Sequence, residues 1–119
     1  METAKNSAVL TADEVLALPV ESLGSIEGVA HQVVWLDDRS TAGRMTVAAG
    51  HHLGPHQHRQ HSHHMWILDG RAEILGVELG AGSYVHIPPG MDHDIDARST
   101  EGCTVFYVYS LETHLPVGR

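Results

Sequence analysis

The sequence predicts an all-β fold, either a sandwich or a barrel. Three observations support this class: many short runs of β-forming residues, glycine-containing turns between them, and almost no helical period. The chain has 119 residues, which suffices for one modest core, so we expect residues 1–119 to form a single domain. Hydrophobic content of 42% and charged content of 18% are ordinary for a soluble globular protein.

The elements are expected in the following order. A short helical turn should run from Asp13 to Leu18, because Thr11 can cap it and Pro19 ends it. The dipeptide Asp69-Gly70 is a tight-turn signal, and we expect it to separate two strands. Further turns are expected at 37–43, 80–82 and 88–90, and strands at 31–36, 44–48, 65–68, 71–75, 77–79, 83–87, 94–97 and 103–111.

Charge and cysteine content limit the possible partners and the location. The formal net charge is -8, which argues against nucleic acid and against an anionic membrane surface. No apolar run reaches the ~18 residues of a membrane span, and the N-terminus lacks the pattern of a signal peptide. Cys103 is the single cysteine, so we expect no internal disulfide and a cytoplasmic location.

The stretch from Gly50 to His64 holds seven of the eleven histidines. Neutral imidazole is the commonest metal ligand among side chains. Because His56 and His58 are two residues apart, they point to the same side of an extended strand and can bind one ion together. We therefore predict a metal site on β-strands. The other histidines are expected to be solvated or ordinary strand residues, namely His31, His51, His52, His61, His64, His86 and His114.

Two motifs resemble those of the cupins, which are small double-stranded β-helix (jelly-roll) barrels. The first, in residues 50–70, is Gly50, five residues, His56-x-His58, four residues, His63, six residues and Gly70. The second, in residues 82–97, is Gly82, five residues, Pro88-x-Gly90, two residues and His93. The N-terminal half also resembles the cupin domains grouped with the anti-sigma factor ChrR, notably in Gly28-Val29, Trp35-Leu-Asp-Asp and Gly43-x-Met-Thr-Val.

The resemblance implies a metal site made by His56, His58, His63 and His93. His63 stands where the family usually has a glutamate, and Ala97 stands where it has an asparagine. His61 shares the strand parity of His63 and competes with it for this role. Four imidazoles suit one divalent transition metal, such as Fe, Zn, Ni, Cu or Mn, better than Mg or Ca. Octahedral coordination would leave two open positions, whereas tetrahedral Zn would be closed and structural.

Strand parity predicts what surrounds this site. If His63 points inward, Met65 and Ile67 also point inward and would make an apolar wall that binds substrate. Tyr107 and Tyr109 share the parity of Val105, and one of them, for which we select Tyr107, could bring its hydroxyl to the same pocket. Asp92 and Asp94 flank His93, and either could orient it from outside the ligand set. The outward-facing Trp66 and Leu68, with the apolar strand Val33–Leu36, predict a homodimer.

Three functions are compatible with the sequence. By family analogy, the first is a metal-dependent dioxygenase-type oxidoreductase that acts on a small organic substrate. The second is a metal-dependent isomerase or lyase, which the lack of a glutamate in the motif makes less favourable. The third is a non-catalytic metal- or ligand-binding module, which the lack of a helical partner-binding extension makes less favourable. In all three, the partner is a small molecule.

Overall fold

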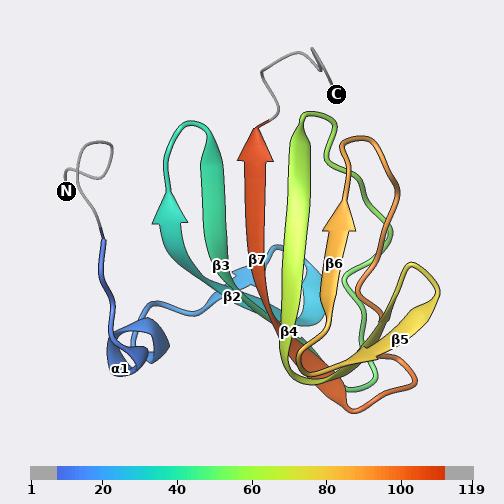
Figure 1. Ribbon diagram of the computed structural model, residues 1–119. Helices are drawn as coiled ribbons and strands as arrows, with labels where there is room; N and C mark the ends of the chain where they lie inside the picture. Colours follow the sequence, from blue (N-terminus) through green and yellow to red (C-terminus); the bar gives the residue numbers. More distant parts are fainter. Residues whose placement is uncertain (1–7, 112–119) are drawn as a thin grey trace.

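The computed structural model describes residues 8–111, which form one helical turn and seven β-strands (Figure 1). Six of the strands follow one another across a curved antiparallel sheet in the order β1-β2-β3-β7-β4-β5, and β6 pairs with β4. This architecture confirms the predicted all-β class. The elements are α1 (Ala12–Leu16), β1 (Glu21–Leu23), β2 (Ile26–Leu36), β3 (Ser40–Ala48), β4 (His61–Ile74), β5 (Val77–Gly80), β6 (Tyr84–Ile87) and β7 (Gly102–Leu111).

A less regular pair of segments lies opposite the strands and closes the barrel. Residues 50–58 run antiparallel to residues 90–97, and the backbones of His56 and His93 exchange two hydrogen bonds of 2.9 Å. The backbones of Glu73 and Asp96 exchange hydrogen bonds of 2.8 and 3.0 Å, which join this pair of segments to the end of β4. The strand expected at 94–97 is therefore present only as isolated bridges.

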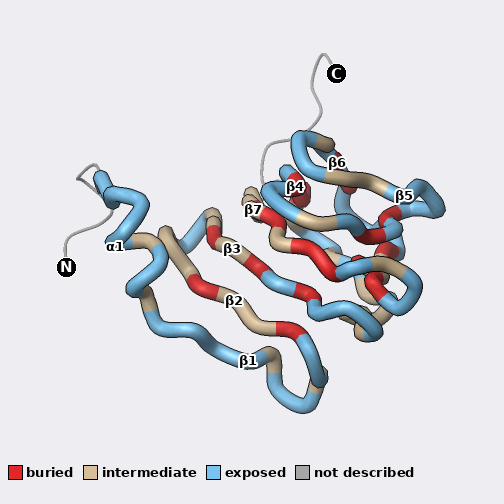
Figure 2. Tube along the Cα trace, turned by 90° about the horizontal axis from the view of Figure 1, so that it is seen from below, coloured by how far each residue is buried: buried red, intermediate tan, exposed pale blue. Residues whose placement is uncertain are grey.

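The long strand β4 alternates between the two faces of the sheet. His63, Met65 and Ile67 are buried, whereas Trp66 and Leu68 are 41% and 48% exposed. Figure 2 shows a similar alternation along part of β3 and β7, where buried residues alternate with intermediate or, in β3, exposed ones. The inward side chains form one apolar core, which includes Val29, Met45, Val47, Ile74, Val85, Ile87, Ile95, Ala97, Cys103 and Val105.

The helix α1 has the cap that the sequence predicts. The Thr11 side chain accepts a hydrogen bond from the Glu14 backbone, and the Glu14 carboxylate accepts one from the Thr11 backbone. The buried Gln32 amide donates to the carbonyls of Val15, Leu16 and Leu18 at the end of the turn. These bonds hold α1 against β2.

Two sequence expectations need correction. Asp69-Gly70 does not end a strand, because β4 continues through it with a bulge between Ile67 and Asp69 opposite β7. Gly70 has a φ of 77° and a Cβ there would overlap the Gly102 carbonyl, so the glycine serves the bulge. The strand at 31–36 also begins earlier, at Ile26, and pairs with the unexpected short β1.

None of the helices within residues 8–111 has the length and hydrophobicity needed to cross a membrane.

Candidate metal centre

Three histidines from the irregular side of the barrel converge on one point. His56, His58 and His93 each offer a ring nitrogen, and these nitrogens all lie within 4.8 Å of one another. The backbone bridge between His56 and His93 brings the two segments together, and the two-residue spacing then directs His58 to the same side. The first motif selects His56 and His58, together with His63, and the second motif selects His93.

Backbone carbonyls orient two of these rings. His56 Nδ1 lies 2.8 Å from the Gly54 carbonyl oxygen, and His93 Nδ1 lies 3.0 Å from the Met91 carbonyl oxygen. A carbonyl only accepts, so each Nδ1 carries the proton and donates it. The lone pair of each ring is therefore on Nε2. Metal-binding histidines commonly have this arrangement, in which the second nitrogen is tied to a backbone oxygen.

His63 approaches the same point from β4 but is not one of the three clustered residues. Its side chain is buried, and its Nδ1 lies 3.3 Å from His93 Nε2. Because His93 Nε2 carries a lone pair, His63 Nδ1–H is the donor in this contact. The Nε2 atoms of His58 and His63 are buried without a hydrogen-bond partner. Buried polar atoms without partners are uncommon and indicate a ligand or ion.

The environment of His58, His63 and His93 favours the neutral form of these three imidazoles. Burial, together with the neighbouring imidazoles, lowers the pKa of His63 to about 2 and that of His58 to about 4. Burial also lowers the pKa of His93, against the effect of its hydrogen bond to Met91. Since only the neutral ring can donate its lone pair to a metal, the site offers the required form at neutral pH.

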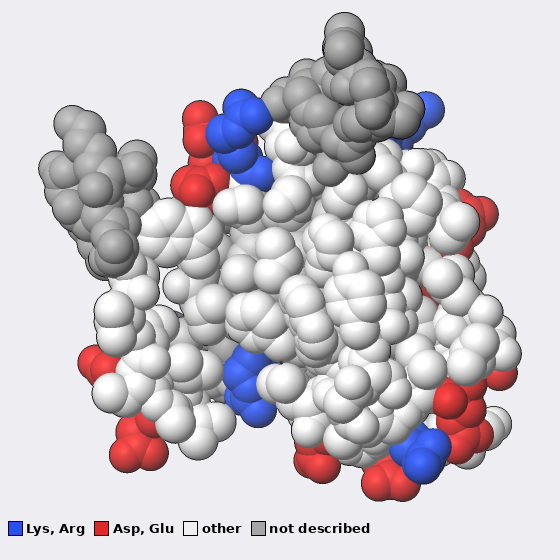
Figure 3. Space-filling model, in the orientation of Figure 1, with Lys and Arg blue, Asp and Glu red and all other residues white. Residues whose placement is uncertain are grey.

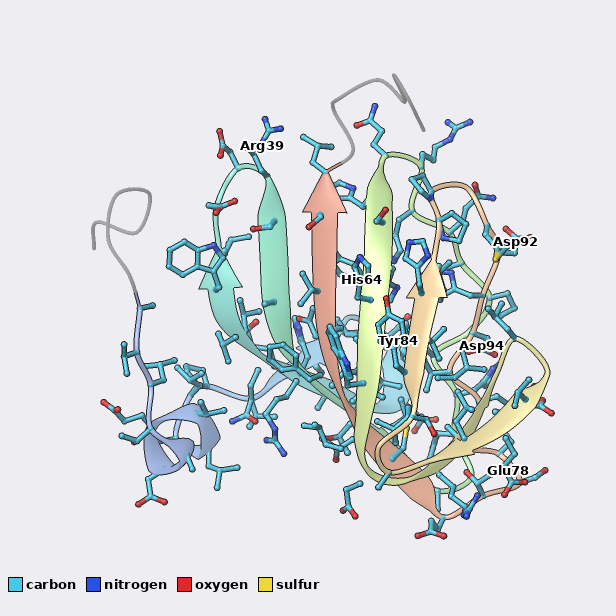
Figure 4. The ribbon with its side chains drawn as sticks, in the orientation of Figure 1. Arg39, His64, Glu78, Tyr84, Asp92 and Asp94 are labelled. Carbon is cyan, nitrogen blue, oxygen red and sulfur yellow. The ribbon has the colours of Figure 1, made fainter. Side chains whose placement is uncertain are left out.

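Asp94 supports the turn that orients His56. Its carboxylate accepts a hydrogen bond of 2.8 Å from the Gly54 backbone and lies 2.8 Å from His52 Nδ1. Figure 4 shows Asp92 and Asp94 on the segment behind β6. Asp92 has a more peripheral contact, since it accepts from the exposed Gln57 amide at 2.9 Å.

A largely apolar cavity of about 430 Å³ opens beside this cluster. Tyr107 lines it, as the sequence suggested. Met65 and Ile67 point inward but are packed in the core and are not among its lining residues. The apolar wall of this cavity comes instead from other residues, among them Leu23, Ile26 and Leu53, which the sequence did not indicate. The lining residues are Leu23, Ile26, His31, Thr41, Met45, Leu53, Gly54, Pro55, His56, His58, Tyr107 and Tyr109.

The remaining histidines lie outside the cluster of three. His61 is at the start of β4 opposite Leu111, His51 packs near Gly28, and His64 and His86 face each other on the outer side of the sheet. His31 reaches the cavity from β2, which differs from the ordinary strand role expected for it. His114 is outside the described residues.

Comparisons with known proteins bear on the family and the fold of this chain. The sequence matches a family model described as the ChrR cupin-like domain over residues 10–111. A search of curated proteins finds no significant match.

Solved structures share the fold at low sequence identity. The chain is similar to an RmlC-like cupin from Shewanella frigidimarina, at 20% identity and a TM-score of 0.73 over 92% of this chain and 95% of that chain. It is also similar to the polyketide cyclase RemF from Streptomyces resistomycificus, at 17% identity and a TM-score of 0.73 over 90% and 87%. A third match is a chain in the structure of Rhodobacter sphaeroides SigE in complex with the anti-sigma ChrR, at 18% identity and a TM-score of 0.64 over 76% and 48%. These likenesses confirm the predicted jelly-roll fold.

Proposed function

The chain belongs to the ChrR cupin-like family, and from this premise we propose that it binds one divalent transition metal ion through His56, His58 and His93, with His63 as the fourth ligand. The main observation that supports this proposal is that three histidine nitrogens lie within 4.8 Å of one another beside a cavity. Two further facts support the fit: the unpartnered, buried Nε2 atoms of His58 and His63, and the Nε2 lone pair that a backbone bond leaves on His56. An all-nitrogen set suits Fe, Zn, Ni, Cu or Mn rather than Ca.

We propose that the bound metal serves a dioxygenase-type oxidation of a small organic substrate. A redox-active ion with open positions would supply the activation of dioxygen. The histidines hold and orient that ion, while Leu23, Ile26 and Met45 line the cavity and exclude water from the substrate. A cavity of about 430 Å³ is within the range that takes a small organic molecule.

The test is metal analysis of protein purified without an affinity tag, followed by oxygen-electrode assays. Protein reloaded with Fe²⁺ should consume oxygen in the presence of a diketone or phenol and consume none after treatment with a chelator. The matched control is His61→Ala, which lies on β4 outside the cluster and should retain full activity. Less than one metal ion per chain after reloading would contradict the proposed site. Stoichiometric metal without oxygen uptake would contradict the dioxygenase.

The alternative is a non-catalytic metal- or ligand-binding module. The similarity to a chain of the SigE complex with the anti-sigma ChrR favours it, since that protein is named for an interaction rather than a reaction. Tight binding of metal and a small molecule without turnover would support this alternative. Conversion of an enolisable ketone without oxygen uptake would instead support an isomerase or lyase, in which the metal acts as a Lewis acid.

We further propose a homodimer formed through the outer face of the sheet. Trp66, Leu68 and Tyr84 are between 41% and 49% exposed, and Phe106 lies opposite Trp66. Figure 3 shows that the face over β3, β7 and β4 is almost free of charged side chains, which gather at its margins. Because the chain carries a net charge of -8, an uncharged face is where two copies can meet with the least repulsion.

Sedimentation velocity tests the dimer at micromolar concentration. Wild-type protein should sediment as a dimer and Trp66→Asp as a monomer. The control is Val77→Asp on β5, which is 54% exposed and should remain dimeric. A monomeric wild type would disprove the proposal.

A further inference from the structure

A chain of three polar side chains leads from the cavity to the surface. The Tyr107 hydroxyl lies 3.1 Å from His31 Nδ1, and His31 Nε2 lies 3.6 Å from Glu21 Oε1. Tyr107 lines the cavity and is buried, whereas the Glu21 side chain is 62% exposed. The three residues come from β7, β2 and β1, so this chain of contacts uses none of the histidines proposed to bind metal.

A glycine permits the contact between Tyr107 and His31. In the sheet, β3 lies between β2 and β7, and its residue opposite Tyr107 is Gly43. A Cβ at position 43 would lie 2.7 Å from the Tyr107 hydroxyl oxygen and 2.6 Å from the Gln32 carbonyl oxygen. Gly43 is not among the glycines with positive φ, so no turn conformation requires it. Its small size therefore allows the close approach of β2 and lets Tyr107 reach across β3.

The position of Glu21 favours one direction of the hydrogen bond between Tyr107 and His31. Its carboxylate faces His31 Nε2, and the negative charge favours a proton on that nitrogen. His31 Nδ1 is then an acceptor, and the Tyr107 O–H donates to it. With its proton engaged in this way, the Tyr107 oxygen presents its free lone pairs to the cavity as a hydrogen-bond acceptor.

We propose that the cavity binds a small, mostly apolar molecule with a hydroxyl group, of the phenol or enol class, and that this hydroxyl donates to Tyr107. This inference names the substrate class of the proposed function and rests on it. His31 and Glu21 are positioning residues, because they fix the polarity of Tyr107 without contacting the ligand. The apolar side chains of Leu23, Ile26 and Met45 receive the carbon skeleton. An ether of the same shape would leave the Tyr107 acceptor buried without a partner, which is costly.

The test compares 2-naphthol with 2-methoxynaphthalene, which has the same rings but cannot donate. Equilibrium dialysis measures the Kd of both, with chelator-treated protein and with protein loaded with Zn²⁺. Wild-type protein should bind naphthol about tenfold more tightly, equivalent to one hydrogen bond of ~1.4 kcal/mol. Tyr107→Phe should reduce this preference to near unity, and Glu21→Gln should reduce it partly, because the proton on His31 is then no longer directed to Nε2.

The matched control is Tyr84→Phe, which removes the hydroxyl of another tyrosine paired with a histidine. The Tyr84 hydroxyl on β6 lies 2.6 Å from Nδ1 of His64 on β4, outside the cavity. Figure 4 shows this pair on the outward face. This variant should retain the tenfold preference. Thermal unfolding of each variant separates a loss of preference from a loss of fold.

Each outcome separates this inference from the proposed function. Zn²⁺ binding without a preference for naphthol would overturn the inference alone, as would a preference for the ether or failure to bind either probe. A preference that depends on Tyr107 in protein that fails to bind Zn²⁺ would overturn the proposed function alone. If Tyr107→Phe lowers the melting temperature but keeps the preference, the contact with His31 is only structural, and the inference is wrong.

Discussion

The two sides of the cavity hold their polar groups by different means. On the irregular side, His56 and His93 are oriented by hydrogen bonds to carbonyls two residues earlier in the chain. On the sheet side, His63 and Tyr109 are oriented mainly by packing, with ring centroids 4.3 Å apart. Short-range hydrogen bonds therefore orient the histidines of the irregular side, whereas the pairing of strands that are distant in sequence orients the rings of the sheet side.

This difference explains for which of the motif's histidines the spacing also determines the orientation of the side chain. A histidine tied to its own segment keeps its orientation wherever that segment runs, so its spacing carries the information. The orientation of His63 depends on β4 and its neighbours β6 and β7 together. The two sides should therefore respond differently to mutation, to loss of supporting contacts and to pH.

The largest expected effect is the loss of a ligand on the irregular side. His56→Ala and His93→Ala should each abolish measurable Zn²⁺ binding in calorimetry, because only two of the three clustered histidines then remain and His63 lies outside that cluster. His61→Ala should bind as the wild type does. Wild-type affinity in His93→Ala would show that the ion is held elsewhere.

A smaller effect is expected for His63. His63→Ala should weaken Zn²⁺ binding without abolishing it, because three clustered histidines remain. His63→Glu should retain metal but bind azide more weakly in the Cu²⁺-loaded protein, since a carboxylate reduces the net charge of the site. Absorption titration measures this change, and His64→Ala serves as the control on the other face of β4. If His61→Ala empties the site and His63→Ala does not, the assigned register is wrong.

The next effect tests the support of the irregular side. Asp94→Ala removes the acceptor for the Gly54 backbone, so the turn that orients His56 loses its restraint. Loss of such an outer contact typically weakens metal binding about tenfold or more. Asp92→Ala should have little effect in the same calorimetric assay, because its partner Gln57 is exposed. Equal effects of the two substitutions would contradict the role assigned to Asp94.

Sequence reasoning therefore succeeded where the information was local. The motif spacings selected His56, His58, His63 and His93, and the structure clusters all of these except His63. Strand parity relative to an inward His63 placed Trp66 outward. It failed at Asp69-Gly70, because a tight turn and a bulge both favour a glycine with positive φ.

His31 was missed for a different reason. It meets Tyr107, 76 residues away, only because β2, β3 and β7 are neighbours in the sheet. No short-range pattern encodes that neighbourhood. The apolar wall of the cavity was missed in the same way, since Leu23 on β1 and Leu53 on the histidine-rich segment come together only in the closed barrel.

The last prediction concerns the metal-free protein and pH. The folded-state pKa values of His58 and His63 are about 4 and about 2, below the ordinary value of 6.5. The unfolded chain therefore binds more protons below pH 6.5, and stability must fall as pH falls. As pH falls from 6.5, each such histidine lowers the free energy of unfolding by about 1.4 kcal/mol per pH unit. This decline stops near the pKa of that histidine in the folded state. His58 should stop contributing near pH 4, whereas His63 should continue to contribute below it.

Urea unfolding in the presence of a chelator, from pH 7 to pH 3, measures these slopes. The wild-type free energy of unfolding minus that of His58→Gln should decline with falling pH and level off near pH 4. The difference for His63→Gln should keep declining, because β4 buries His63 more completely than the irregular side buries His58. Subtracting each variant from the wild type cancels the carboxyl groups that titrate in the same range. Two difference curves that level off at the same pH would contradict the deeper burial of His63.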